Sequence, residues 1–172
     1  MKKLFLLLLL CCTTPLFAQD MDLQAENSQY KVFFKIEKQG QEDEANQIGV
    51  YVLNKETERM FKLFTSDTEE RVANEPDSMG QLSNLLGACF YEGEPTRLII
   101  TECFNFHTDY SVIIDLRTRK FIKLGWGNPI GFTQENNFVI LNGFSYYSEG
   151  GRYDVLRIYD ANGKLVKNVD VK

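Results

Sequence analysis

The stretch "SVIIDLRTRKFIKLGWG", residues 111–127, decides the fold. Its first apolar run ends at Asp115, a charged break follows, and a second apolar run ends at Gly125. Much the same phrase recurs as "VYVLNKETERMFKLF" at 50–64 and as "DVLRIYDANGKLVKNV" at 154–169. Short apolar runs separated by residues that favour tight reversals are typical of antiparallel hairpins. The sequence therefore predicts an all-β chain in which one hairpin pattern occurs three times.

Two longer copies surround the later phrases when Gly87 is aligned with Gly131. The first copy spans 86–124 and the second 130–169, and Asp115 then corresponds to Asp160. The breaks within each copy carry Gly, Pro, Asn or Asp, the residues that tight turns require. Each copy is expected to form four short strands, at 86–91, 97–106, 110–116 and 119–124 in the first and at 130–133, 137–146, 153–159 and 164–169 in the second.

A third, incomplete copy is predicted upstream, near 30–64. It offers three apolar or alternating runs, at 31–38, 47–54 and 59–64, and therefore three strands. A polar connector, 65–84, separates it from the next copy. Ser66 and Glu69 have the spacing of a capping box, which favours a helical turn over 67–73.

Four-stranded units of about 40–45 residues have the size of propeller blades. The stretches "DYSVIIDLRTRKFIKL" (109–124) and "YDVLRIYDANGKLVKN" (153–168) resemble the third and fourth strands of β-propeller blades in general, and no single family. Propellers usually need about four blades or more. We therefore expect antiparallel meander sheets in blade-like units, packed as a sandwich or barrel or as an incomplete propeller. Two chains that complete one ring, or a plain β-sandwich of similar hairpins, are further alternatives.

The first 18 residues, "MKKLFLLLLLCCTTPLFA", have the features of a bacterial secretory signal peptide cleaved after Ala18. The apolar run is shorter than the roughly 20 residues that span a bilayer. A lipid anchor on Cys11 or Cys12 is disfavoured because Leu10 is bulky where a small residue is expected. Residues 19–172 are expected to form a single all-β domain exported to the periplasm, the cell surface or the medium, and not to span a membrane.

The expected mature chain is acidic. Loss of Lys2 and Lys3 leaves 17 of the 19 basic residues against 24 acidic ones, a net charge of −7. Nucleic-acid binding needs a basic face, and no Lys/Arg cluster provides one. One histidine and two cysteines are too few for a zinc cluster, and "DANG" at 160–163 lacks the acids of a calcium loop. No metal or other cofactor is expected.

The two cysteines of the expected mature chain, Cys89 and Cys103, are predicted to be free. A hairpin that turns at 92–95 pairs Cys89 with Leu98 or Ile99. Cys103 then lies four or five residues further along, about 13–17 Å away. A disulfide needs Cα atoms within about 7 Å, so two separate thiols are favoured, although an oxidising compartment permits a bridge.

Enzymatic activity is not expected. A Cys–His–Asp site could use His107, Asp109 and a cysteine, but the nucleophile and the base must lie within hydrogen-bond reach. Cys103 and His107 are four residues apart on one strand, about 13 Å if it is extended. An exported enzyme that uses His107 and Asp109 is therefore kept only as a third alternative.

Aromatic and arginine side chains on loops suggest a binding role, because Trp, Tyr and Arg dominate interface hot spots and loops concentrate binding residues. The sequence predicts a small exported binding or interaction protein of unknown ligand and undetermined oligomeric state, with another protein as the candidate partner. An acidic inhibitor or immunity-type partner of a basic secreted protein is the second alternative. The candidate residues are Tyr146, Tyr147, Glu149 and Arg152 in one loop, His107 and Asp109 at the equivalent place in the preceding unit, and Trp126 between the copies.

Overall fold

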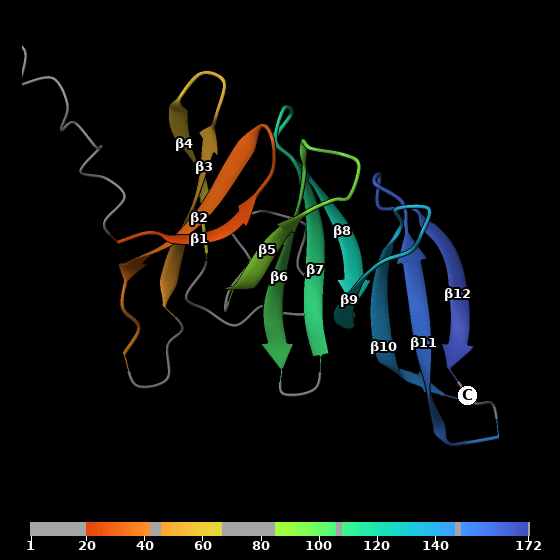
Figure 1. Ribbon diagram of the computed structural model, residues 1–172. Coiled ribbons are helices and arrows are strands. Elements are labelled where there is room, and N and C mark those ends of the chain that lie inside the picture. Colours follow the sequence, from red (N-terminus) through yellow and green to blue (C-terminus); the bar gives the residue numbers. More distant parts are fainter. Residues whose placement is uncertain (1–19, 42–45, 67–84, 106–107, 147–148, 172) are drawn as a thin grey trace, which may run out of the picture.

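A computed structural model describes residues 20–41, 46–66, 85–105, 108–146 and 149–171, with the backbone alone at 104–105, 108, 143–146 and 152. The regular elements of these segments are strands, and consecutive strands form three separate four-stranded antiparallel sheets (Figure 1). We name the sheets blades A, B and C. They stand side by side in chain order, so that blade B lies between the other two.

Each blade is a simple meander of four neighbouring strands. Blade A consists of β1 (Asp22–Glu26), β2 (Tyr30–Lys38), β3 (Gln47–Asn54) and β4 (Arg59–Thr65). Blade B consists of β5 (Leu85–Phe90), β6 (Arg97–Asn105), β7 (Thr108–Asp115) and β8 (Lys120–Trp126). Blade C consists of β9 (Asn128–Phe132), β10 (Phe138–Tyr146), β11 (Arg152–Tyr159) and β12 (Leu165–Val171).

The predicted all-β, blade-like organisation is confirmed, and the two long copies correspond to blades B and C. The prediction of only three strands in the upstream copy was wrong, because β1 pairs with β2 and completes blade A. The segment "DLQAE" is short and largely polar. Its Ala25 packs against the core while Leu23 is 51% exposed, so it lacks the strong apolar pattern by which the other strands were recognised.

The recurring phrase marks the turn between the third and fourth strand of every blade. Asn54, Asp115 and Asp160 each accept two backbone N–H groups from the following loop through Oδ1, at 2.8–3.3 Å. A side-chain acceptor that satisfies loop N–H groups in this way replaces a backbone turn. A loop residue near the start of each fourth strand has a positive φ, at Glu58 (54°), Arg119 (56°) and Gly163 (74°).

Blade B is buried on both faces. Successive side chains of a strand point to opposite faces of the sheet, so neighbouring residues of β6 and β7 enter different cores. One core lies between blades A and B and contains Leu98, Ile100, Val112 and Ile114 from blade B. The other lies between blades B and C and contains Ile99 and Ile113. Of the packings that the sequence left open, two cores between three separate sheets correspond to an incomplete propeller.

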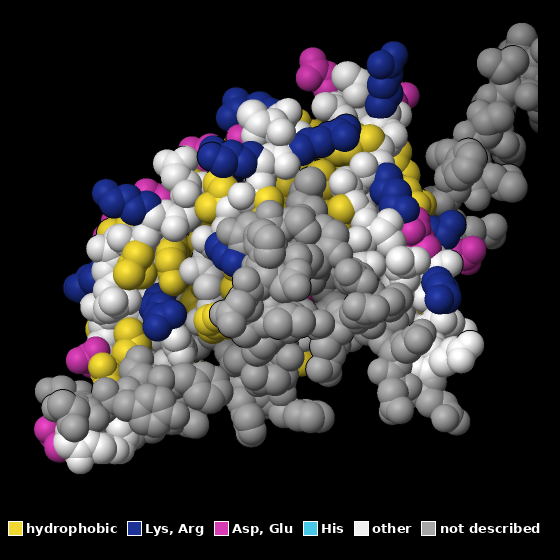
Figure 2. Space-filling model, turned by 180° about the vertical axis from the view of Figure 1, so that it is seen from behind, with side chains coloured by type: hydrophobic (Ala, Val, Ile, Leu, Met, Phe, Trp, Pro, Cys, Tyr) yellow, Lys and Arg dark blue, Asp and Glu magenta, His cyan; other side chains and the backbone are white. Residues whose placement is uncertain are grey.

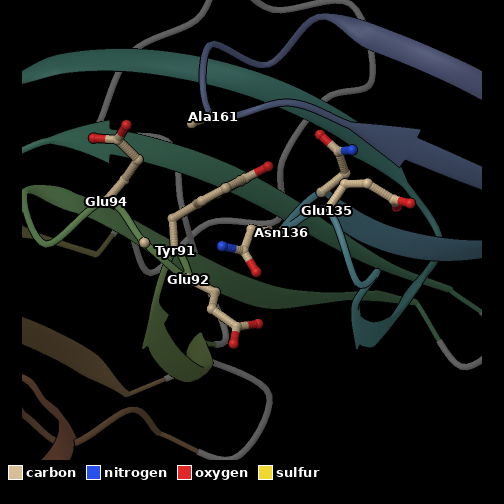
Figure 3. Close-up of a pocket in the computed structure, with 8 residues that line it drawn as sticks. Tyr91, Glu92, Glu94, Glu135, Asn136 and Ala161 are labelled. Carbon is tan, nitrogen blue, oxygen red and sulfur yellow. The ribbon is translucent and has the colours of Figure 1, made fainter.

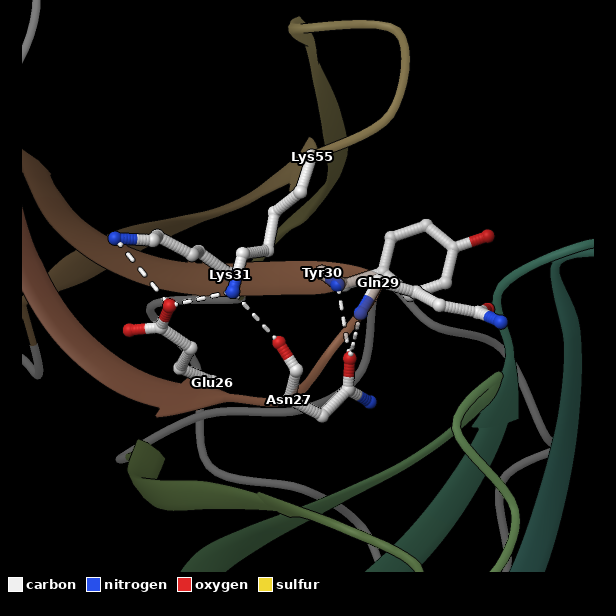
Figure 4. Close-up of polar contacts among 6 residues, drawn as sticks. All are labelled: Glu26, Asn27, Gln29, Tyr30, Lys31 and Lys55. Atoms are coloured by element: carbon white, nitrogen blue, oxygen red, sulfur yellow. Dashed lines mark hydrogen bonds and ion pairs between the residues drawn. The ribbon is translucent and has the colours of Figure 1, made fainter.

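Blade A is joined to blade B by contacts between their first turns. The amide of Asn27 donates to the carbonyl of Pro95 at 2.8 Å. The Oδ1 of the same side chain accepts the backbone N–H groups of Gln29 and Tyr30, each at 2.8 Å (Figure 4). The Tyr30 ring stacks on Phe90 of blade B, with centroids 6.4 Å apart. One asparagine thereby shapes its own turn and fixes the neighbouring blade.

Blade B is joined to blade C by a buried tyrosine and by a short link. The hydroxyl of Tyr91 donates to the carbonyl of Tyr159 at 2.9 Å and accepts the N–H of Phe138 at 3.3 Å. Gly127 alone connects β8 to β9, with a φ of 132°, and a Cβ there would come within 2.5 Å of the Leu141 carbonyl oxygen. Only glycine fits this conformation and this close approach.

The connector between blades A and B begins later than predicted. Thr65 belongs to β4, and Ser66 continues the pairing by exchanging hydrogen bonds with Ile48, at 2.7 Å between the main chains and 2.8 Å to its hydroxyl. The predicted helical turn over 67–73 and the predicted signal peptide lie outside the described residues. Within the described residues, no helix is long and apolar enough to cross a bilayer.

Candidate functional site

At one end of the blade array, the second strand of each blade ends and the third strand begins, for β2 and β3, β6 and β7, and β10 and β11 (Figure 1). We call this the hairpin end. The turns around Asn54, Asp115 and Asp160 lie at the opposite end, which we call the turn end. The described members of the two predicted groups belong to the hairpin end: Asp109 in blade B, and Tyr146, Glu149 and Arg152 in blade C. The fold therefore places the ends of β6 and β10 and the starts of β7 and β11 on the same side of the molecule.

The β10–β11 hairpin is closed by two of the predicted residues. Tyr146 and Arg152 are directly opposite each other in the register, so they form the last cross-strand pair before the loop. Glu149 is exposed, and Gly150 and Gly151 follow with φ angles of 96° and 93°. Two consecutive positive φ angles are readily adopted only by glycine, so the loop backbone has a defined shape. The fourth predicted residue of this loop, Tyr147, lies outside the described residues.

Asp109, in the equivalent hairpin of blade B, is half-buried at the junction with blade C. Its backbone carbonyl accepts the N–H of Gly127 at 2.9 Å, and its N–H donates to the side chain of Asn128 at 3.3 Å. Partial burial raises the pKa of the Asp109 carboxyl above its usual value. Its predicted neighbour His107 lies outside the described residues, so the pairing of these two side chains stays a prediction.

Trp126 occupies the last position of β8 and is half-buried. Its ring packs on that of Tyr110, with centroids 4.6 Å apart and the planes at 56°, and it adjoins the core between blades A and B. Tyr110 is only 2% exposed. Trp126 therefore contributes at least one face to packing, and its role in binding stays a prediction.

Both described cysteines are free, as predicted. Cys89 is opposite Ile99 and Cys103 is opposite Asp109 in the register of blade B, which is the offset inferred from the sequence. Although part of Cys89 is solvent-exposed, burial of its thiol raises the pKa to about 11. A thiol with this pKa is protonated at neutral pH and is a poor nucleophile.

A pocket of about 220 Å³ opens at the turn end, between the first turns of blades B and C (Figure 3). The Tyr91 side chain runs along it, and three exposed glutamates surround it: Glu92, Glu94 and Glu135. Asn136 and Ala161 complete much of the wall. Burial raises the pKa of the Tyr91 hydroxyl, so this group remains a neutral donor at neutral pH. The pocket is thus a shallow acidic depression beside a rigid contact between two blades.

The sequence analysis missed this pocket because its walls come from turns about 40 residues apart that only the packing of two blades brings together. The breaks between the predicted strands at 92–96 and 134–136 were expected to be turns, and the structure has turns there. An acidic depression attracts cationic groups such as amines and guanidinium groups. In the described parts of the chain, no group of three or more His, Cys, Asp or Glu side chains has a metal-binding arrangement.

Comparison with known proteins supports the fold. No family model and no curated protein matches this chain. A solved structure that matches is a β-propeller domain with an open velcro topology, from the Trilobed protease of Pyrococcus furiosus. The two share 9% sequence identity with a TM-score of 0.53, and the match covers 88% of this chain but only 43% of that one. The chain is therefore similar to less than half of a propeller, and the likeness concerns the fold alone.

Proposed function

We propose that the protein is an exported binding protein that holds a partner protein at the hairpin end, without catalysis. The observation that supports this proposal is the alignment of the β6–β7 and β10–β11 hairpins on one side of a rigid array. Loops placed by a rigid scaffold are the usual location of binding residues. Export of the protein is part of the proposal and depends on the leader-like sequence at 1–18.

The β10–β11 loop has the composition expected of a binding loop. Tyrosine and arginine give large contact areas and directed hydrogen bonds at interfaces. Tyr146 and Arg152 flank the loop as a cross-strand pair, so they stand on the ends of strands and not on the most distant part of the loop. Residues at strand ends are held in place by the sheet, which lowers the entropy lost on binding.

The test is a pull-down from the native cell envelope, followed by mass spectrometry and a binding assay with the partner found. Tyr147→Ala combined with Arg152→Ala should weaken binding at least about tenfold and leave the melting temperature within about 2 °C. The matched control changes the opposite end: Glu92→Gln with Glu135→Gln should bind the partner as the unaltered protein does. Loss of the fold in the alanine variant would place Tyr147 and Arg152 in the core, and unchanged binding would refute the proposed surface.

A second candidate function is supported by the acidic pocket at the turn end. The three glutamates around this depression would complement a basic partner. The protein would then be an inhibitor or immunity-type partner of a basic secreted protein. In that case the Glu92→Gln, Glu135→Gln variant would lose affinity while the hairpin-end variant would not. Association would also slow steeply between about 0.01 and 0.15 M salt, because screening weakens electrostatic steering.

A further inference from the structure

The blade repeat gives each blade a face that is directed towards the next blade. The central pair of this face comes from the second and third strands, and the third-strand member lies two positions before Asn54, Asp115 or Asp160. The equivalent pairs are Val32 with Val52 in blade A, Ile99 with Ile113 in blade B, and Val139 with Ile158 in blade C. We call this side of a blade its forward face and the opposite side its backward face.

In blades A and B the forward pair is fully enclosed by the next blade. Val32 and Val52 are 0% exposed in the core between A and B, and Ile113 is 0% exposed in the core between B and C. Blade C carries the same apolar pair, but neither Val139 nor Ile158 belongs to either core. No described blade lies in front of this face, because blade C stands at one end of the row (Figure 1).

The forward face of blade C carries further apolar residues, and its polar members are Lys167 beside Ile158, Asn128 beside Leu141 and Asp154 beside Val171. Leu141 and Leu156 form the next cross-strand pair, and Val169 lies beside Leu156 on β12. All three are half-buried, and Val171 at the end of β12 is 42% exposed. Hydrophobic side chains are visible between charged ones on blade C, at the left of Figure 2. The centre of this face therefore has the same apolar cross-strand pairing as the internal blade–blade faces.

The backward face of blade A is the other uncovered end of the array. It presents Phe33 and Leu53, both half-buried, with Met60 at 38% and Leu23 at 51% exposure. Several of its polar groups are paired with one another. The carboxylate of Glu37 accepts hydrogen bonds from the Tyr51 hydroxyl at 2.5 Å and from Lys62 at 2.6 Å. Groups paired in this way lower the cost of covering the face, because they are not left unsatisfied when water leaves.

Exposed large hydrophobic residues are concentrated in the two end blades. Blade A has three, blade C has four, and blade B has only Leu86 among the described residues. A contact that used only the face of blade C would leave the apolar residues of blade A exposed. A contact that joins both ends would cover Leu23 and Met60 on the backward face of blade A and Val171 on the forward face of blade C.

We propose that a second copy of this chain covers both end faces, with the forward face of blade C of each copy against the backward face of blade A of the other. The contact continues the blade-to-blade packing already present twice within the chain. Three blades correspond to 43% of the similar propeller domain, so two copies would supply six blades, within the usual range for a closed ring. Two-fold symmetry is the commonest arrangement of soluble oligomers.

The test measures the mass of the purified protein in solution by sedimentation equilibrium, for the unaltered chain and three lysine variants. Ile158→Lys changes the forward face of blade C, and Leu53→Lys changes the backward face of blade A. Each should weaken the dimer at least about tenfold, because the interface would bury an unpaired charge. Leu86→Lys is the matched control, at an exposed leucine of the middle blade, and it should remain dimeric.

If one end-blade variant is less stable than the unaltered protein, a mixture of the two variants still tests the proposed contact. The blade A of Ile158→Lys and the blade C of Leu53→Lys are both unaltered, so an equimolar mixture should recover dimers through one intact contact. A monomeric unaltered protein at about 100 μM would overturn the proposal. A dimer that survives Leu53→Lys but not Ile158→Lys would show that blade C pairs with blade C. A dimer that is unaffected by either substitution would place the interface elsewhere. If the end faces are covered only when another protein is added, self-association is excluded.

Discussion

The hydroxyl of Tyr91 is the most direct way to test how blades B and C are joined. Tyr91 is 3% exposed, and its hydroxyl links blade B to the Tyr159 carbonyl at 2.9 Å and to the Phe138 N–H at 3.3 Å. Tyr91→Phe removes this one atom and retains the ring, which packs edge-on against Phe132 with centroids 5.2 Å apart. The substitution therefore isolates two hydrogen bonds between blades from the apolar packing around them.

The expected loss of stability follows from these two bonds. Each net hydrogen bond contributes about 1 kcal/mol, and a buried group that loses its partner costs about 1–3 kcal/mol. Relaxation of the two backbone groups towards other partners reduces the sum, so we expect Tyr91→Phe to lower the free energy of unfolding by about 2 kcal/mol. For a chain of this length, that corresponds to a fall in melting temperature of about 4–8 °C.

The assay is urea unfolding followed by circular dichroism, with thermal unfolding as a second measurement. Tyr30→Phe is the matched control, because its ring also packs between blades while its hydroxyl has no hydrogen-bond partner among the described residues (Figure 4). The control should change the free energy of unfolding by less than about 0.5 kcal/mol. An equally small effect of Tyr91→Phe would refute the assignment of this hydroxyl as a link between blades B and C.

Three further predictions concern single residues. Burial alone would raise the pKa of Asp115, but loop N–H groups and Arg97, 3.1 Å away, hold this pKa below its usual value. The free energy of unfolding, measured with urea, should therefore fall as the pH drops below about 4. The fall should be smaller in Asp115→Asn than in the unaltered protein. Cys89 should react with iodoacetamide more slowly than a free cysteine at pH 7.5, and equal rates would contradict its raised pKa. Gly127→Ala should lower the free energy of unfolding by about 2 kcal/mol or more, whereas an unchanged value would contradict the tight β8–β9 link.

Most of the fold could be predicted because hairpin turns leave a local signal. An Asn or Asp at the end of a third strand, followed by a loop and an apolar strand, is a pattern contained within about 15 residues. The pairing of Cys89 with Ile99 was within the predicted range for the same reason, since the turn at 92–95 fixes the register on both sides. Local chemistry therefore determined the strands of blades B and C.

Features that depend on contacts between blades could not be predicted. The polar segment of β1 gains its place by pairing with β2 and by packing Ala25 against the core. Glu102 is 1% exposed in the middle of blade B, although a glutamate in an alternating strand would be expected at the surface. The acidic pocket likewise exists only because the first turns of blades B and C meet. Each of these depends on which sheet faces which, and this is not a property of any short stretch.

The central claim is that blade B is enclosed by blades A and C on its two faces, and the free energies of unfolding of Ile113→Ala and Ile114→Ala test it most directly. Both side chains are 0% exposed, but they enter different cores. The account predicts that each substitution lowers the free energy of unfolding by about 2–5 kcal/mol, as core truncations do. If one of the two neighbours changes it by less than about 1 kcal/mol, one face of blade B is open to solvent and the three-blade arrangement is contradicted.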